Sequence, residues 1–427
     1  MTAKLAPLAL ALALTVILVS PMAAHGRAED IPPRGCAPGD IVRWLTPPAS
    51  ASSTISPTTP LTPAFYSIEP RPGFDPTTAS DADLSCYGMP PRPSATTARG
   101  LAVAADVLAS ERARWNTEMA QAHYVVPVLG QTPPTMRGFD PAAGAGVSHP
   151  LPTAARVPHL PRRASRNFTR IVESDTLWTG YVIESKDNNN YYYTLVEADF
   201  TVPTATFGPN GTDNGQVTVW AGLGGDTLAN PQPYPTTDTN DTRLIWQAGT
   251  ATIVDPRVAF WFENFGCQFH PSAPCDNGSA GPGTEDFNIL DAPSVQAGDK
   301  VRVDLNAANG TYYFYNFSTG QATDVHPVSI DNYNTGLSAE FVVEQGGCNT
   351  GCSYATYPTV TFSNAIAGSN GTGQFLDVLN YRRMDLCDDA EFITTVPSDV
   401  DPNTHGYSVS ANSGQYISSP CINMRTI

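Results

Sequence analysis

The sequence has few charged residues, and most of them are acidic. Asp, Glu, Lys and Arg make up only 15% of its 427 residues, and 23 basic residues face 40 acidic ones, for a formal net charge of −17. A nucleic-acid-binding protein needs a basic surface to neutralise phosphates. The charge balance therefore excludes nucleic acid as a partner.

Common catalytic signatures are also missing. The sequence has no His-Glu-x-x-His zinc motif, no Gly-x-Ser-x-Gly elbow, no phosphate-binding Gly-x-x-x-x-Gly-Lys-Ser/Thr loop and no Gly-x-Gly-x-x-Gly fingerprint. The Asp-Thr-Gly and Asp-Ser-Gly triplets of paired-aspartate proteases do not occur either. Only His270, His326 and His405 follow residue 166, so a His-based triad is possible but has no motif behind it.

Long apolar runs are absent except at the N-terminus. Lys4 precedes an apolar stretch from Leu5 to Val19, and small residues follow at Ala24 and Gly26. The stretch is shorter than the roughly 20 residues of a membrane-spanning helix. The pattern is typical of a secretory signal. We therefore expect residues 1–26 to be a signal peptide and the mature protein to be secreted without a membrane partner; a membrane anchor is the alternative.

Export permits disulfide bonds. Two of the eight cysteines precede residue 167 and six follow it, so each part of the chain can close its own bridges. Nearest-neighbour pairing predicts the bridges 36–86, 267–275, 348–352 and 387–421, which is one of several possible connectivities. Cys348 and Cys352 have a spacing that zinc ligands also use, but no second pair follows at finger distance, so we expect no metal site.

Charge divides the chain near residue 166. Residues 1–166 carry 11 acidic and 14 basic side chains, a net of +3, whereas residues 167–427 carry 29 and 9, a net of −20. The basic cluster Arg162–Arg166 precedes this boundary. We expect residues 27–166 to be a propeptide that is cleaved in this cluster. The alternatives are an ordinary linker and a permanent N-terminal domain.

The expected propeptide combines a Pro-rich segment with one helix. Residues 27–94 are rich in Pro, Ser, Thr and Ala, which predicts extended or loosely ordered chain. Apolar residues recur every three or four positions from Thr96 to His123, the pattern of a helix. We expect this helix to dock on the acidic part and to detach near pH 4, where carboxylates protonate. Its candidate docking residues are the apolar stripe and Arg99, Arg112 and Arg114.

The second part, residues 167–427, has the texture of an all-β protein. Short β-branched and aromatic runs at 217–220, 301–305, 312–315 and 341–343 are separated by turns rich in Gly, Asn and Asp. Within 301–305, apolar residues alternate with Arg and Asp, which predicts a strand with one face towards solvent. These features predict an antiparallel two-sheet β-sandwich of the jelly-roll or concanavalin-like kind after a Pro-rich, partly helical propeptide.

Nine short blocks follow one another between Trp178 and Ala365. They lie at 178–182, 198–203, 219–226, 244–249, 260–263, 296–299, 316–321, 338–344 and 360–365. The most telling are LIWQAG, which contains Gln247, and SAEFVVE, which contains Glu340. In this order the blocks resemble the eqolisins, the glutamic endopeptidase family. Each block alone is a weak signal, whereas nine in order are specific.

The resemblance implies a β-sandwich, an N-terminal propeptide, acid-active endopeptidase activity and no metal or other cofactor. It implies Gln247 and Glu340 as the catalytic pair. Gly224 and Ala251 depart from the pattern, because the family often has acidic residues there. Protein or peptide substrates and a monomeric enzyme are expected. Three residues of the same blocks are expected to line the substrate cleft: Trp220, Trp261 and Glu263.

The chemistry of the pair suits amide hydrolysis, which needs a base for water and a donor for the developing oxyanion. A glutamate can be this base at acidic pH, since its ordinary pKa is about 4.3. A glutamine side chain supplies an N–H donor at any pH. Glu344 is a rival base on the same strand face, but four strand steps put it about 13 Å from Glu340, too far to share one water.

Two other functions fit an acidic β-sandwich. A glycoside hydrolase would use two carboxylates about 5–9 Å apart, such as Glu263 and Glu340. A lectin-like module would stack sugars on exposed aromatic rings, for which Tyr191, Tyr192 and Tyr193 are candidates.

Overall fold

Strands dominate the computed structural model. It describes residues 36–45, 65–95, 105–130, 171–175, 178–189, 191–206, 216–224, 245–253, 257–265, 288–308, 310–327, 336–346, 355–369, 372–387 and 394–411. All of these belong to one compact unit, which spans residues 35–427. Three predicted features lie outside the described residues. They are the signal peptide, the Arg162–Arg166 cluster and the side chains of six cysteines, Cys267, Cys275, Cys348, Cys352, Cys387 and Cys421.

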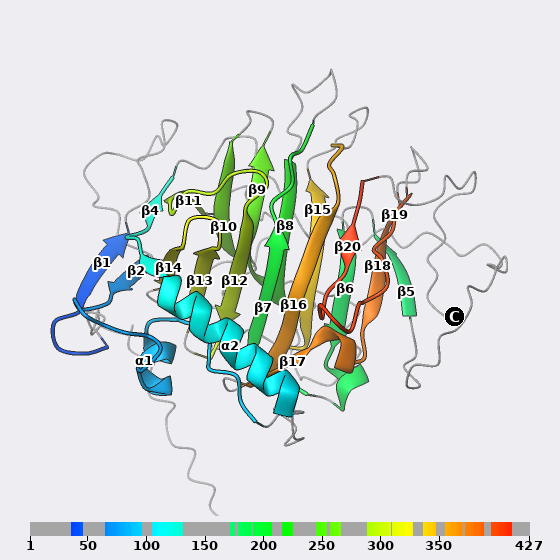
Figure 1. Ribbon diagram of the computed structural model, residues 1–427. Helices are drawn as coiled ribbons and strands as arrows, with labels where there is room; N and C mark the ends of the chain where they lie inside the picture. The colour runs from blue at the N-terminus through cyan, green and yellow to red at the C-terminus, as the bar shows by residue number, and fades with distance from the viewer. Residues whose placement is uncertain are drawn as a thin grey trace, which may run out of the picture. The chain divides into compact units, whose positions relative to one another are not determined.

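The strands form two stacked sheets (Figure 1). The first, here called the front sheet, has the order β1 (Ile41–Leu45), β2 (Phe65–Glu69), β14 (Gln321–Pro327), β13 (Thr311–Asn316), β12 (Lys300–Asn306), β7 (Leu195–Thr201), β16 (Val360–Ser369) and β17 (Thr372–Phe375). Two short strands join it, β3 (His123–Tyr124) beside β14 and β20 (Ser408–Val409) beside β16.

The second, here called the back sheet, has the order β19 (Thr394–Thr395), β18 (Arg382–Cys387), β6 (Trp178–Glu184), β15 (Ser338–Gly346), β8 (Gln216–Gly224), β9 (Ile245–Ile253), β10 (Val258–Phe265), β11 (Asn288–Ala292) and β4 (Val128–Leu129). Strand β5 (Ile171–Asp175) lies beside β18. Among the described strands all pairs are antiparallel except β3–β14 and β5–β18. The predicted all-β, antiparallel two-sheet sandwich is confirmed.

The four predicted strand runs are confirmed as β8, β12, β13 and β15. Successive residues of a strand point to opposite faces of its sheet. In β12 this sends Val301, Val303 and Leu305 into the core between the sheets, where each is at most 1% exposed. The same core holds Val219 of β8 and Phe341 of β15.

The polar face of β12 differs from the prediction. Arg302 and Asp304 are not turned to solvent; they are 1% and 2% exposed. Helix α2 (Ala105–Gln121) crosses the outer side of the front sheet at this point (Figure 1). The alternation of apolar and polar residues along β12 was predicted correctly. The exposure of its polar face was not, because a polar strand face that a charged helix covers has the same sequence pattern as a face in contact with water.

The predicted helix at Thr96–His123 is confirmed as α2 over Ala105–Gln121, and residues 96–104 lie outside the described part. Trp115 and Met119 of its apolar stripe are buried against Leu84 of the short helix α1 (Asp81–Cys86). No helix in the described residues is long and apolar enough to cross a membrane.

The expectation that residues 27–94 are loosely ordered is wrong for residues 36–45, which include β1, and for residues 65–94. The latter stretch contains β2 and α1, and Ser80 caps α1 through a reciprocal bond with Asp83. The predicted bridge Cys36–Cys86 is confirmed. Composition does not reveal this order, because it rests on a few apolar residues of the stretch, such as Phe65, that are buried against the sandwich.

Candidate active site

A row of side chains crosses the outer face of the back sheet, on the side away from the front sheet. The strand register aligns Glu340 of β15 with Gly222 of β8, Gly222 with Gln247 of β9, and Gln247 with Glu263 of β10. The three polar side chains have no exposed surface. The structure therefore brings the two residues of the expected dyad, Gln247 and Glu340, together in one row.

Gly222 separates the two residues of the expected dyad. Neighbouring strands lie about 4.8 Å apart, so the backbones of Glu340 and Gln247 are about 10 Å apart. A Cβ atom on Gly222 would lie 2.9 Å from Cζ3 of Trp220 and 3.0 Å from the carbonyl oxygen of Trp246. Because no side chain projects from residue 222, no side chain of this row lies between those of Glu340 and Gln247.

Gln247 is held by its neighbour in the row. Its Nε2 donates a hydrogen bond of 2.7 Å to Oε2 of Glu263. An amide nitrogen carries two N–H groups, so one remains for another acceptor. The Oε1 atom of Gln247 is buried and has no hydrogen-bond partner among the described residues. Glu263 therefore fixes the orientation of the amide.

The expected cleft residues Trp220 and Trp261 lie on the same outer face and are fully buried. Nε1 of Trp220 donates to Oε2 of Glu344 at 2.9 Å, and the ring meets that of Trp178 edge-on at 5.0 Å. Glu344, the rival base, lies four residues from Glu340 along β15. Its carboxyl group accepts this hydrogen bond from Trp220 of β8.

The sequence does not reveal three features of this face. The roles of Gly222 as spacer and of Glu263 as holder of Gln247 depend on strand register, which the blocks do not encode. Arg382 of β18 also lies in the row, because Val182 pairs with both Glu340 and Arg382. Its guanidinium contacts Glu184 at 2.8 Å.

The two departures from the family pattern, Gly224 and Ala251, also belong to the back sheet. Ala251 is buried in the apolar cluster around Trp220 and Trp261. The described residues contain no group of three or more His, Cys, Asp or Glu side chains arranged to hold a metal ion.

A second cluster contains the residue types of a serine-protease triad. His326 Nε2 lies 2.6 Å from Asp324 Oδ2, and Ser67 Oγ donates to Asp324 Oδ1 at 3.0 Å. In a catalytic triad the histidine lies between the serine and the acid, so that it can take the serine proton. Here the aspartate lies in the middle, so this geometry does not activate Ser67.

Comparison with known proteins identifies the family. A model of the peptidase A4 family matches residues 176–404, more than half of the chain. The chain belongs to this family. The members are the eqolisins, so the resemblance found in the sequence is confirmed and the protein is a peptidase of the glutamic type. Comparison with curated proteins gives no match.

Solved eqolisin structures are similar to this one. Scytalido-glutamic peptidase with a transition state analog inhibitor is 18% identical; the match covers 55% of this chain and 98% of that chain, with a TM-score of 0.39. SCP-B, a member of the eqolisin family in a complex with the tripeptide Ala-Ile-His, is also 18% identical, with the same coverages and a TM-score of 0.38.

Proposed function

We propose that this eqolisin is a secreted, acid-active endopeptidase in which Glu340 and Gln247 hydrolyse peptide bonds of protein substrates without a metal. The observation that carries the proposal is the register that puts both residues on one sheet face with only Gly222 between them. The N-terminal apolar stretch and the excess of acidic residues support export and function in acid.

In this mechanism the two side chains act on opposite sides of the scissile carbonyl. Glu340 takes a proton from a water molecule as the water oxygen attacks the carbonyl carbon. The free N–H of Gln247 donates to the oxyanion of the tetrahedral intermediate. Glu340 then gives its proton to the leaving amine, and the C–N bond breaks.

The competing functions fit the structure less well. Glu263 and Glu340 are three strands apart, about 14 Å between backbones, and Glu263 is bonded to Gln247. This does not suit the carboxylate pair of a glycoside hydrolase. A tyrosine platform for sugars is also not formed, because Tyr193 is buried in the core while Tyr192 is 39% exposed.

The decisive test is incubation at pH 4 with denatured casein and, separately, with a β-glucan. Cleavage of casein alone is the expected result. Release of sugar would instead support a glycoside hydrolase, and binding of the glucan without turnover would support a lectin.

Replacing Glu263 by glutamine should lower kcat about tenfold with little change in KM. The carboxyl group that accepts the bond from Gln247 would become an amide, and a loss of about 1.4 kcal/mol in positioning corresponds to a factor of about ten. Steady-state kinetics on a peptide substrate would check this. An unchanged kcat would show that Glu263 does not position the amide.

Chelators should leave the activity unchanged, because the proposed chemistry uses only protein groups. The check is peptidase activity before and after dialysis against EDTA. Complete loss that a divalent ion restores would contradict the metal-free mechanism.

We further propose that residues 27–166 are a propeptide that acts as an intramolecular inhibitor until the chain is cut near Arg162–Arg166. The charge difference across residue 166 supports this. Helix α2 itself lies on the front sheet, whereas β15 and β9, which carry Glu340 and Gln247, belong to the back sheet (Figure 1). To test the proposal, the full-length protein is shifted from pH 7 to pH 4 while mass and activity are followed together. Full activity without any cleavage would contradict inhibition by this segment.

A further inference from the structure

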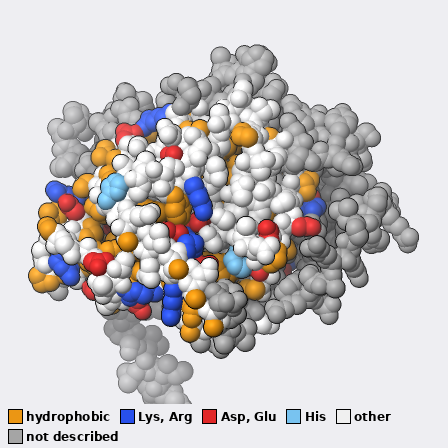
Figure 2. Space-filling model, viewed as in Figure 1, with side chains coloured by type: hydrophobic (Ala, Val, Ile, Leu, Met, Phe, Trp, Pro, Cys, Tyr) orange, Lys and Arg blue, Asp and Glu red, His pale blue; other side chains and the backbone are white. Residues whose placement is uncertain are grey.

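A cavity of about 170 Å³ lies between the chain that precedes residue 131 and the strands β13 and β14 of the front sheet. The loop after β2, the turn after α1 and the chain after α2 line its outer side. The surface over β1, β2 and α1 carries hydrophobic side chains among basic and acidic ones (Figure 2). The row of the dyad belongs to the back sheet, so this cavity is outside the candidate active site.

The cavity reaches the surface beside Gly73. This residue is exposed, and a Cβ atom on it would meet no atom within 4 Å apart from its chain neighbours. Arg71 and Phe74 are half-buried, whereas Tyr87 and Tyr313 are only 1% exposed. The cavity therefore runs from the surface to buried rings on the sheet.

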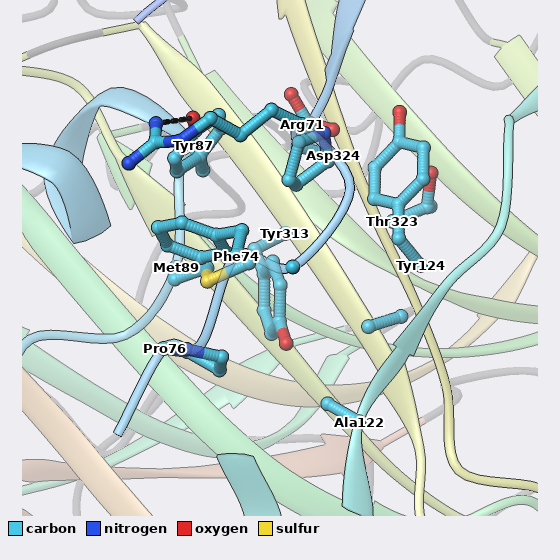
Figure 3. Close-up of a pocket in the computed structure, with 13 residues that line it drawn as sticks. Arg71, Phe74, Pro76, Tyr87, Met89, Ala122, Tyr124, Tyr313, Thr323 and Asp324 are labelled. Atoms are coloured by element: carbon cyan, nitrogen blue, oxygen red, sulfur yellow. Dashed lines mark hydrogen bonds between the residues drawn. The ribbon is translucent and has the colours of Figure 1, made fainter. Parts of the chain in front are cut away.

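Four aromatic rings line the cavity, those of Phe74, Tyr87, Tyr124 and Tyr313 (Figure 3). The rings of Phe74 and Tyr87 meet edge-on, with 4.5 Å between their centroids. Aromatic rings favour such contacts with one another, and an apolar cavity of about 150 Å³ can hold a benzene molecule. The size and the walls of the cavity therefore suit one six-membered aromatic ring.

Arg71 brings to the cavity a positive charge that has no ion-pair partner in the described part of the chain. Its guanidinium lies over the ring of Phe74, 5.8 Å from the centroid, and its Nη1 donates to the hydroxyl of Tyr87 at 3.3 Å. A guanidinium has five N–H groups and binds a carboxylate with two of them. Donors therefore remain for an anionic ligand.

Two carboxyl groups of this region have donors other than that guanidinium. Asp324, which lines the cavity, accepts a hydrogen bond from Ser67 Oγ at 3.0 Å. Asp40 accepts from the hydroxyl of Tyr87 at 2.8 Å and from the backbone N–H of Arg71 at 3.1 Å. The charge of the Arg71 side chain is therefore available to an anion that enters the cavity.

Tyr313 supplies a second unused polar group. Its hydroxyl has no hydrogen-bond partner among the described residues, although the residue is 1% exposed. In Figure 3 this hydroxyl points away from Arg71, towards Pro76 and Ala122. A buried hydroxyl without a partner is costly. The cavity therefore offers a cation at one end and a phenol hydroxyl at the other.

We propose that this cavity binds a monocyclic aromatic carboxylate. The carboxylate accepts hydrogen bonds from the guanidinium of Arg71, the ring packs among the four aromatic side chains, and a hydroxyl on the ring bonds to that of Tyr313. Two sources carry this chemistry, a free aromatic acid and the C-terminal tyrosine of a peptide. The inference concerns the front sheet and does not rest on the peptidase function.

The first experiment titrates the full-length protein with 4-hydroxyphenylacetate, followed by ligand-observed NMR at pH 6, where the acid is ionised. A dissociation constant of about 0.1 to 1 mM is expected for a ligand of this size. The uncharged 4-hydroxyphenylacetamide should bind at least about tenfold more weakly. Equal binding of the acid and the amide, or no saturable binding of the acid, would overturn the inference.

N-acetyl-tyrosine distinguishes the two sources, because its carboxylate lies beside a peptide-like amide. Binding at least as tight as that of 4-hydroxyphenylacetate, and lost in Arg71→Met, assigns the cavity to peptide C-termini. Binding of the small acid alone assigns it to free aromatic acids.

The ring end of the cavity is tested with phenylacetate, which lacks the hydroxyl. It should bind to the wild type about 3- to 10-fold more weakly than 4-hydroxyphenylacetate, the range of one hydrogen bond. In Tyr313→Phe the two acids should bind equally. Equal affinities in the wild type, or a difference that persists in Tyr313→Phe, would overturn the placement of the ring hydroxyl.

A matched pair of arginine variants locates the carboxylate. Arg71→Met should weaken binding of 4-hydroxyphenylacetate about 10- to 100-fold. Arg43→Met is the control, because the Arg43 side chain is 46% exposed and pairs with Glu69 at 2.8 Å; binding should change by less than about twofold. Equal effects of the two variants would contradict the role of Arg71.

Ala122→Phe fills the cavity and leaves Arg71 in place, so it tests occupancy separately from charge. This variant should bind neither 4-hydroxyphenylacetate nor N-acetyl-tyrosine, and a melting curve like that of the wild type would show that it is folded. Binding that survives in both Ala122→Phe and Arg71→Met would lie elsewhere on the protein and would overturn the inference.

Discussion

Replacing Glu340 by glutamine should abolish nearly all peptidase activity at pH 4 while the protein stays folded. The side chain keeps its size but can no longer take a proton from water. A positioned general base contributes a factor of about 10² to 10⁴ to the rate, and a loss of this size is expected in kcat. Turnover of a peptide substrate and a thermal melting curve would be measured together.

Glu344→Gln is the matched control. Glu344 lies on the same strand and the same sheet face, is equally buried and accepts a hydrogen bond from Trp220. A glutamine can still accept that bond through its carbonyl oxygen. Activity within a few-fold of wild type is expected. If Glu344→Gln were the inactive variant and Glu340→Gln the active one, the roles of the two residues would have to be exchanged.

The sequence proposes Gln247 and Glu340 as the dyad because these residues sit in blocks that resemble a known family. The blocks indicate which glutamine and which glutamate to choose among many. They do not contain the register of β15, β8, β9 and β10, which alone aligns Glu340, Gly222, Gln247 and Glu263. Register depends on packing of the whole sheet face, and a shift by one residue would turn every side chain to the other side.

The place of the N-terminal segment could not be predicted for a different reason. Its strands are only two to five residues long, and a two-residue strand such as β4 has no periodicity to detect. Likewise, the charged face of β12 carries no sign that Glu118 and Arg114 will cover it. Long-range partners of this kind are visible in the structure alone.

Gln247→Ala should reduce kcat about 10²- to 10³-fold, the cost of losing one oxyanion donor. The change removes the N–H that would stabilise the tetrahedral intermediate and leaves Oε2 of Glu263 without its 2.7 Å bond. KM should change little, because an oxyanion forms only after the substrate is bound. The measurement is kcat and KM on one peptide across pH 3 to 6, since an amide donor should be lost equally at every pH.

Gln216→Ala is the control for this variant. Gln216 lies at the start of β8, is 4% exposed and faces the same side of the back sheet, six residues before Gly222. Because it is outside the row of the dyad, its replacement should leave kcat within a few-fold of wild type. An equal loss in both variants would mean that Gln247 acts through the stability of the sheet. A loss confined to Gln247→Ala, with an unchanged melting curve, would assign the oxyanion to its amide.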